Sequence, residues 1–217
     1  MINVEGLTKS FGPQKVLREL SLDVATGTIT IVIGRSGGGK SVFLKHLIGL
    51  MRPDAGRIMV DGVDISRLRG RALDEIRRAY GVVFQGGALF DSMSCFDNVA
   101  FPLREKVRTP PDELTKRVAI ARALVTEPEI VFFDEPTTGL DPVLVNTIHH
   151  LMLDLHRRFR FTAVVVSHEI PEIFEIADTV AMLHEGRIVE VGPPAAIQGS
   201  TNPVVQKFIK GEPDTGS

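Results

Sequence analysis

The chain has 217 residues, a length that suits one domain with a sizeable buried core. Its 25 Lys and Arg residues against 27 Asp and Glu residues give a formal net charge of −2, so no broad basic surface is available to hold nucleic acid non-specifically. Hydrophobic residues make up 43% and charged residues 24%, which excludes the composition of an intrinsically disordered chain.

Short β-branched runs alternate with longer segments of helical spacing, which is typical of an α/β fold with a mainly parallel sheet. The stretch to about residue 24 alternates less regularly and has turn signals at Gly12 and Gly27, so we expect antiparallel strands there, at an edge. The other predicted strands are residues 28–33, 57–60, 81–84, 130–133, 162–166 and 179–183.

Three of these runs, 29–33, 130–133 and 162–166, are almost entirely apolar, so we expect them to be neighbours in the centre of the sheet. Residues 187–191 are predicted to form the second arm of a late hairpin, and the tail 211–217 is expected to be loose.

The single cysteine, Cys95, cannot form a disulfide within the chain, which is typical of a reducing compartment. The first ten residues lack the basic-then-apolar order of a secretory signal, and no apolar stretch reaches the ~18 residues of a membrane span. We therefore expect a cytosolic protein; if it works at a membrane, another chain has to cross it.

The strongest local signal is GRSGGGKS at residues 34–41, a full match to the phosphate-loop pattern GxxxxGK(S/T) between a predicted strand and a predicted helix. An ordinary glycine-rich turn is the alternative, but it explains neither the Lys-Ser pair nor this position. Lys40 is expected to reach the β- and γ-phosphates and Ser41 to ligate Mg²⁺. The remaining candidate phosphate-binding residues are Gly34, Ser36, Gly37, Gly38 and Gly39.

A pair of acidic residues follows the apolar run 130–133, in the sequence IVFFDEP. Asp134 is the candidate that supports Mg²⁺, and Glu135 is the candidate that orients the attacking water. Adjacent acids before a proline often only close a strand, so this interpretation depends on the phosphate loop.

The motifs GRSGGGKS, FFDEPTTGLDP and VVVSHE, in this order, resemble the ATPase subunit of an ABC transporter over nearly the whole chain. The resemblance implies a P-loop NTPase fold of the ABC ATPase type, with a mainly parallel central sheet, an N-terminal antiparallel β subdomain and a helical subdomain. It further implies a single nucleotide-binding domain over 1–217, ATP and Mg²⁺ as cofactors, ATP hydrolysis, and a homodimer of ATPase subunits.

The resemblance also implies roles for four further residues. Gln85 matches the glutamine that senses Mg²⁺ and nucleotide and couples to the membrane subunit, and His168 matches the switch histidine at the γ-phosphate. Asp141 matches the D-loop aspartate, although a helix N-cap before proline explains it equally. Phe11 matches the aromatic that stacks on adenine, but it could simply cover the sheet edge.

A narrower resemblance, to the Mla-type (MCE-associated) ATPases, rests on GRSGGGKSV, GALFDSM and the segment from 173 to 192. It implies phospholipid transport through a separate MCE-associated permease at the cytoplasmic face of a bacterial inner membrane. A small STAS-type protein and a lipid-binding MCE protein are further implied partners. Apolar residues after Gln85 are expected either to meet the permease or to be core of the helical lobe: Leu89, Phe90, Met93 and Phe96.

One departure from the family is clear, because no LSGGQ-like signature precedes the strand that ends at Asp134. PDEL at 111–114 runs directly into TKRVAIARAL, so the helical lobe, at about 86–125, is predicted to be shortened. In the family each signature closes the partner's nucleotide site. Either the natural protein carries the segment and the present chain lacks it, or this is a truncated ATPase without efficient turnover.

The sequence thus predicts an ATP-binding subunit that hydrolyses Mg-ATP to drive lipid transport. Two rival functions remain open: a nucleotide-binding interaction module with little turnover, favoured by the absent signature, and a soluble DNA-repair or translation ATPase. Near-neutral charge and the single nucleotide domain argue against the second rival.

Overall fold

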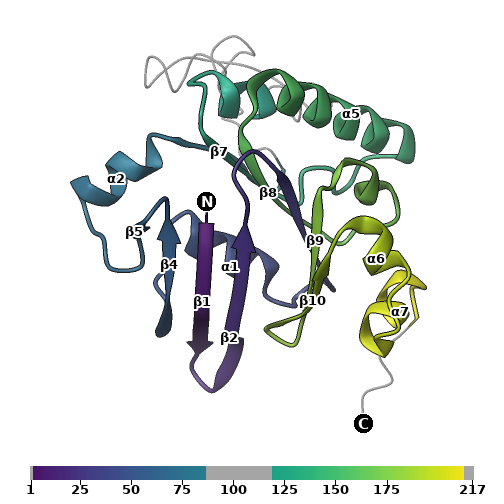
Figure 1. Cartoon of the computed structure of the whole chain (residues 1–217), viewed down its shortest axis with the longest axis horizontal. Coiled ribbons are helices and arrows are strands. Elements are labelled where there is room, and N and C mark those ends of the chain that lie inside the picture. The colour runs from purple at the N-terminus through teal and green to yellow at the C-terminus, as the bar shows by residue number, and fades with distance from the viewer. Residues whose placement is uncertain (1, 87–118, 213–217) are drawn as a thin grey trace.

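The structure, a computed structural model, describes residues 2–86 and 119–212 and contains two β-sheets (Figure 1). The first sheet is antiparallel, and its strands lie in the order β2-β1-β4-β5. Their bounds are β1 (Ile2–Phe11), β2 (Gln14–Val24), β4 (Ala55–Val60) and β5 (Val63–Asp64). This sheet is the predicted N-terminal β subdomain.

The second sheet has the order β10-β9-β3-β8-β7-β6, and all its pairs are parallel except the terminal β9–β10 hairpin. Its strands are β3 (Ile29–Ile33), β6 (Tyr80–Val83), β7 (Ile130–Asp134), β8 (Thr162–Ser167), β9 (Thr179–His184) and β10 (Arg187–Gly192). The neighbours β3, β8 and β7 are the three apolar runs predicted for the centre, and every residue of them is buried because helices cover both faces.

The described helices follow or flank these strands (Figure 1). They are α1 (Lys40–Leu47), α2 (Arg71–Arg77), α5 (Pro142–Phe159), α6 (Pro194–Gln198) and α7 (Pro203–Ile209), with a 3-10 turn η1 (Glu172–Ile176). Residues 119–124 are also helical. None of the helices in 2–86 and 119–212 is long and apolar enough to cross a membrane.

The strand prediction at 57–60 was placed in the wrong sheet. Those residues belong to β4, which pairs antiparallel with β1 and lies in the first sheet rather than among the parallel strands. The run of four residues carries no signal for its partner, and the pairing is set by the distant strand β1. The predicted late hairpin, in contrast, is confirmed as β9 and β10.

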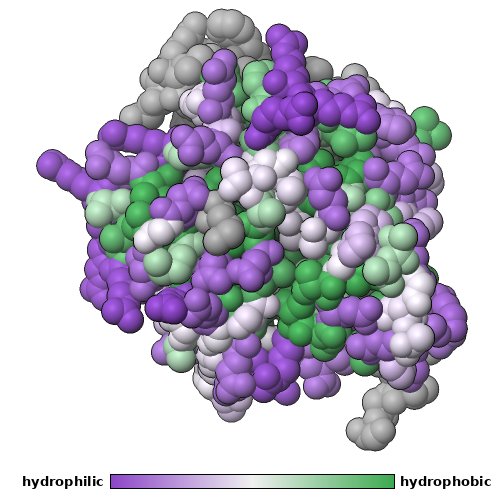
Figure 2. Space-filling view, viewed as in Figure 1, coloured by the Kyte–Doolittle hydropathy of each residue, from purple (hydrophilic) through white to green (hydrophobic). Residues whose placement is uncertain are grey.

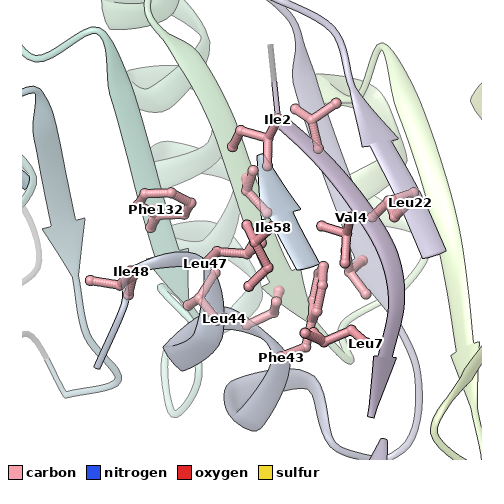
Figure 3. Packing of buried hydrophobic residues seen from close by; sticks show 14 of the residues in the cluster. Ile2, Val4, Leu7, Leu22, Phe43, Leu44, Leu47, Ile48, Ile58 and Phe132 are labelled. Atoms are coloured by element: carbon pink, nitrogen blue, oxygen red, sulfur yellow. The ribbon is translucent and has the colours of Figure 1, made fainter. Parts of the chain in front are cut away.

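Two apolar clusters hold the sheets and helices together. The first lies between the antiparallel sheet, α1 and one face of the parallel sheet, and Figure 3 shows Phe43 and Leu44 of α1 beside Val4 of β1. The second covers the opposite face of the parallel sheet, where α5 contributes Ile148 and Met152. Helix α1, which follows the phosphate loop, is thereby fixed on both sides by residues far away in the sequence.

The two sheets meet closely at Val16 of β2, which lies between two glycines. A Cβ atom on Gly186, in the β9–β10 turn, would lie 2.4 Å from the Val16 carbonyl oxygen. A Cβ atom on Gly39 would lie 3.3 Å from the Val16 side chain. The Arg18 N–H donates to the Gly186 carbonyl oxygen at 2.8 Å. The late hairpin is therefore in direct backbone contact with β2, and the phosphate loop packs closely against β2 at Val16.

The surface in the view of Figure 2 mixes hydrophobic and hydrophilic residues, and the visible apolar patches are bordered by hydrophilic side chains. Several sequence predictions fall outside the described residues. These are most of the helical lobe at 86–125, most of the tail 211–217, Cys95 and the four apolar residues Leu89, Phe90, Met93 and Phe96.

Candidate functional site: a phosphate loop beside two acidic residues

The phosphate loop connects β3 to α1 and needs glycine at specific points. A Cβ atom on Gly34 would lie 2.3 Å from the Leu183 carbonyl oxygen of β9, so no side chain fits there. Gly37 and Gly39 have φ values of 76° and 100°, which residues with side chains rarely adopt. These conformations let the chain turn sharply at the N-terminus of α1, and the N-terminal end of a helix is a favourable place for an anion.

Lys40 is almost fully buried at the bottom of this loop, with a side chain that is 4% exposed. Its ammonium donates to the Gly34 and Arg35 carbonyl oxygens at 2.8 and 3.2 Å, so it is tied to the loop that it closes. It also forms an ion pair with Glu135 Oε1 at 3.1 Å, between two buried side chains. A positive charge is thus fixed within the concave side of the loop.

Ser41 and Asp134 come together although they are 93 residues apart in the sequence. The Ser41 hydroxyl donates to Asp134 Oδ1 at 2.8 Å, because α1 begins beside the end of β7. Burial raises the pKa of the Asp134 carboxyl above its usual value, and the hydrogen bond from Ser41 opposes this shift only in part. A nearby cation would relieve the cost of keeping this carboxylate charged.

Glu135 is 7% exposed and has a backbone φ of 49°, unusual for a residue with a side chain. Its N–H donates to the Val166 carbonyl oxygen at 3.0 Å, which holds the strained residue against β8. Besides Lys40, its carboxylate accepts hydrogen bonds from His168 Nδ1 at 2.5 Å and from Thr138 Oγ1 at 3.3 Å.

His168 follows β8 and its side chain is 39% exposed. A carboxylate only accepts hydrogen bonds, so the contact with Glu135 assigns the proton to Nδ1 and leaves Nε2 available to another ligand. The histidine is therefore tied to the site through Glu135.

A cavity of about 350 Å³ lies at this loop. Nine of its lining residues are among the predicted site residues: Phe11, Ser36, Gly37, Gly39, Lys40, Ser41, Gln85, Glu135 and His168. Val16 and Val42 also line it and were missed by the sequence analysis. Val42 directly follows the phosphate-loop motif, so its place in the cavity lining was predictable from the sequence. Val16 reaches the cavity only because the two sheets pack together.

Phe11 ends a strand of the first sheet and Gln85 follows a strand of the second, but both residues line the same cavity. Phe11 ends β1 and is 46% exposed, and Lys9 Nζ lies 5.8 Å from its ring centroid. An exposed aromatic face at the mouth of a phosphate pocket is available to a planar base. This exposure argues against the alternative that Phe11 only covers the sheet edge.

Asp141 does not line this cavity. It is the N-cap of α5, where its Oδ1 accepts from the Val143 and Leu144 N–H groups at 3.0 and 3.2 Å and Pro142 occupies the first helical position. The local capping alternative is thus confirmed, and a contact of Asp141 with a second subunit stays a prediction. Gly34, Gly38 and Asp134 also lie outside the cavity lining, but Gly34 and Asp134 bond to residues that line it.

The donor set fits a magnesium nucleotide. Ser41 and Asp134 supply a hydroxyl and a carboxylate oxygen, the hard ligands that Mg²⁺ prefers, and its remaining positions are usually taken by phosphate and water. Backbone N–H groups, the helix N-terminus and Lys40 supply the positive charge that a polyphosphate requires. The arrangement can therefore bind a nucleoside triphosphate and place a carboxylate and an imidazole beside it.

Comparisons with known proteins agree with this geometry. Residues 17–116 match the family model described as ABC transporter. The chain is 38% identical to a probable ribonucleotide transport ATP-binding protein, mkl, of Mycobacterium leprae, over 97% of this chain and 69% of that protein. It is 36% and 34% identical to the intermembrane phospholipid transport ATP-binding proteins MlaF of Haemophilus influenzae and Escherichia coli K12, over 99% of this chain and 92% and 90% of theirs.

The alignments also bear on the missing signature. They extend over 238 to 242 residues, whereas the whole chain has 217, so these relatives carry residues that have no counterpart here. The match to the family model ends at residue 116, within the segment where the signature is expected. The departure lies in or beside residues outside the described part of the chain.

Solved structures give the same fold. The dimeric ATP-binding cassette MJ0796 bound to ADP and Pi is 26% identical, with a TM-score of 0.79 over 89% of this chain and 99% of that one. CbiO1 of Clostridium perfringens, part of an ABC transporter complex, is 25% identical, with a TM-score of 0.82 over 95% of this chain and 93% of that one. Phosphate loop, acidic pair, fold and relatives lead to one conclusion: this chain belongs to the family of ATP-hydrolysing subunits of ABC transporters, which bind ATP and Mg²⁺.

Proposed function

We propose that this chain hydrolyses Mg-ATP to drive phospholipid transport through a separate membrane permease. The observation that supports the ATPase part is the contact of Ser41 with Asp134 beside the Lys40–Glu135 ion pair, at one phosphate loop. We assign the first pair to the metal and Glu135 to the attacking water. The cargo rests on the two MlaF proteins, named for intermembrane phospholipid transport, which the chain matches over nearly its whole length.

In this proposal Lys40 and the backbone of 36–40 bind the phosphates. Ser41, Asp134 and Gln85 hold Mg²⁺, which when bound neutralises charge on the phosphate oxygens. Phe11 stacks on the adenine ring, and Asp141 both caps α5 and faces a second subunit.

Glu135 orients the water that attacks the γ-phosphate, and His168 contacts that phosphate through Nε2. The Nδ1 proton of His168 holds the Glu135 carboxylate, so the two residues act as a unit. The phosphates compete with Glu135 for the Lys40 ammonium, and a Glu135 carboxylate released from that ion pair is free to accept a proton from water.

We further propose that two copies pair head to tail and work at the cytoplasmic face of a bacterial inner membrane, as a peripheral subunit. The named MlaF relatives and the dimeric cassette support this arrangement. An MCE-associated permease, a small STAS-type protein and a lipid-binding MCE protein are the proposed partners.

The ATPase roles are tested by two substitutions. Lys40→Ala should weaken ATP binding at least about 10-fold, because it removes the buried cation. Glu135→Gln should retain ATP affinity and lower turnover by about 10²-fold or more, because it removes only the base. Lys207→Ala, on α7 and outside the lining of the nucleotide cavity, is the matched control, and circular dichroism checks that each variant is folded. Equal loss of affinity in both variants would contradict the roles.

The same measurement separates this proposal from a nucleotide-binding module with little turnover. The sequence lacks the signature that closes the partner's site, so that rival predicts wild-type ATP affinity without hydrolysis. ATP turnover that Glu135→Gln abolishes supports the ATPase; binding without turnover in the permease complex supports the module.

The cargo needs its own test, because the mkl relative is named for ribonucleotide transport. The chain is reconstituted with its permease in liposomes, and ATP-dependent movement of a fluorescent phospholipid is compared with uptake of a labelled ribonucleotide. Phospholipid movement that stops in Glu135→Gln supports the proposal. Ribonucleotide uptake without lipid movement would overturn the assigned cargo while leaving the ATPase intact.

A further inference from the structure

The loop after β7 and the loop after β8 lie side by side, because the two strands are parallel neighbours with Asp134 opposite Val166. Glu135, the first residue after β7, makes two contacts here: its N–H donates to the Val166 carbonyl oxygen within β8, and its carboxylate accepts from His168 in the loop after β8. A third contact, between Thr137 and Glu169, lies one step farther from the nucleotide cavity and has no role in the site described so far.

The Thr137 hydroxyl donates to Glu169 Oε2. Thr137 is completely buried, so its hydroxyl depends on this acceptor. Glu169 is itself held at the backbone, because its N–H donates to Ser167 Oγ at 3.1 Å, and Ser167 is also completely buried. One fixed group on each loop is therefore joined to the other.

The contact extends toward α5. The Thr137 carbonyl oxygen accepts from the Leu140 N–H at 3.0 Å, which fixes the turn that leads into the Asp141 cap. Glu169 lines a second cavity of about 240 Å³ together with Leu140 and Pro142, and neither Thr137 nor Glu169 lines the nucleotide cavity. The pair thus lies outside the lining of the nucleotide cavity, next to the loops that carry Glu135 and His168.

We propose that Thr137 and Glu169 form a positioning pair for ATP hydrolysis. Their hydrogen bond keeps the loops after β7 and β8 in register, and the carboxylate of Glu135 consequently stays in contact with the imidazole of His168. The inference rests on the proposed function, because it takes from there the roles of Glu135 and His168. Small displacements of reacting groups lower catalytic rates strongly while substrate binding through other groups persists.

Four variants test the pair. Thr137→Val removes the hydroxyl and keeps the shape, whereas Thr137→Ser keeps the hydroxyl. Glu169→Ala removes the acceptor, whereas Glu169→Gln retains an acceptor oxygen. Thr147→Val is the matched control, since the Thr147 hydroxyl bonds only within α5, to the Val143 carbonyl oxygen at 2.8 Å.

We expect Thr137→Val and Glu169→Ala each to lower kcat about 10-fold while the KM for Mg-ATP and the ATP affinity change about 2-fold or less. Thr137→Ser, Glu169→Gln and Thr147→Val should stay within about 2-fold of wild-type kcat. The double variant Thr137→Val/Glu169→Ala should be no slower than either single variant, because each substitution removes the same hydrogen bond.

A second readout does not need turnover. The imidazole NMR signals of His168, identified by their loss in His168→Gln, should move toward those of a free histidine in Thr137→Val and not in Thr137→Ser. Unchanged His168 signals together with wild-type kcat in Thr137→Val would overturn the proposal. A loss of kcat that accompanies a lower melting temperature, and that Thr137→Ser shows as well, would also overturn it. If the wild-type chain shows no turnover, the proposed function fails and the NMR comparison alone decides the positioning pair.

Discussion

At the scale of single residues, Asp134 illustrates a site residue that opposes folding. Its carboxyl pKa is raised in the folded protein, chiefly by burial, so ionisation of this group costs stability at neutral pH. We expect Asp134→Asn to raise the free energy of unfolding of the nucleotide-free chain at pH 7 on the order of 1 kcal/mol, about 2–4 °C in melting temperature, while Mg-dependent ATP binding falls.

The sign of the pH dependence gives the check. A raised folded pKa means that the cost is absent below the unfolded pKa and grows as the pH rises through the folded pKa. The advantage of Asp134→Asn should therefore shrink on acidification when unfolding is followed in urea. Asp154→Asn, at an exposed ion pair with Arg157, is the control and should change stability little. A variant less stable than wild type at pH 7 would refute the argument.

His149 on α5 is a second residue with a predictable pH response. It is 3% exposed, and neither ring nitrogen has a hydrogen-bond partner among residues 2–86 and 119–212. Burial lowers its pKa to about 4, a shift that Glu172 opposes and His150 increases. Because the unfolded chain binds the His149 proton more readily than the folded protein does, the group costs no stability above pH 6.5 and costs progressively more as the pH falls toward 4. The wild type should lose about 2 kcal/mol through this group between pH 7.5 and 5, and His149→Leu should not.

The matched control is His156, a buried histidine two turns along the same helix. Its Nε2 bonds to the Gly27 carbonyl oxygen at 3.1 Å, so His156→Leu should lose about 1 kcal/mol at pH 7.5. Urea unfolding at both pH values compares the two. If His149→Leu keeps the full wild-type pH dependence, the histidine is not the group responsible.

At the scale of elements, α5 depends on Asp141, the N-cap residue that precedes it. Asp141→Ala removes both hydrogen bonds of the N-cap and should cost about 1 kcal/mol, whereas Asp141→Asn retains an acceptor and should leave the melting temperature nearly unchanged. Calorimetry on the isolated chain measures this cap alone. An Asn variant as unstable as the Ala variant would show that charge rather than capping matters.

Elements with strong local signals were predictable, and those defined by distant pairing were not. The glycines and the Lys-Ser pair locate the phosphate loop because their chemistry is local. The apolar runs of β3, β7 and β8 indicate central strands because they are buried on both faces. The sheet of β4 depends on its register with β1, and Val16 enters the nucleotide cavity only when the two sheets pack. Neither contact has a sequence pattern.

At the scale of the whole molecule, Gly186 joins the two sheets. Gly186→Ala would place Cβ 2.4 Å from the Val16 carbonyl oxygen, in addition to the strain of a φ of 75°. We expect the free energy of unfolding to fall by about 2 kcal/mol or more. We also expect weaker ATP binding, because Val16 lines the nucleotide cavity. Gly62→Ala is the control: it has a φ of 86° and open space, so it shows the backbone strain alone. Equal losses in both variants would exclude the clash.

The close approach of the late hairpin to β2 has a further use. The Arg18 amide donates across the junction to Gly186, so its hydrogen cannot exchange with solvent until the two sheets separate. Deuterium uptake at this one amide therefore reports how often the two sheets separate. Residues from both sheets line the nucleotide cavity, so the same measurement shows whether added nucleotide slows that separation.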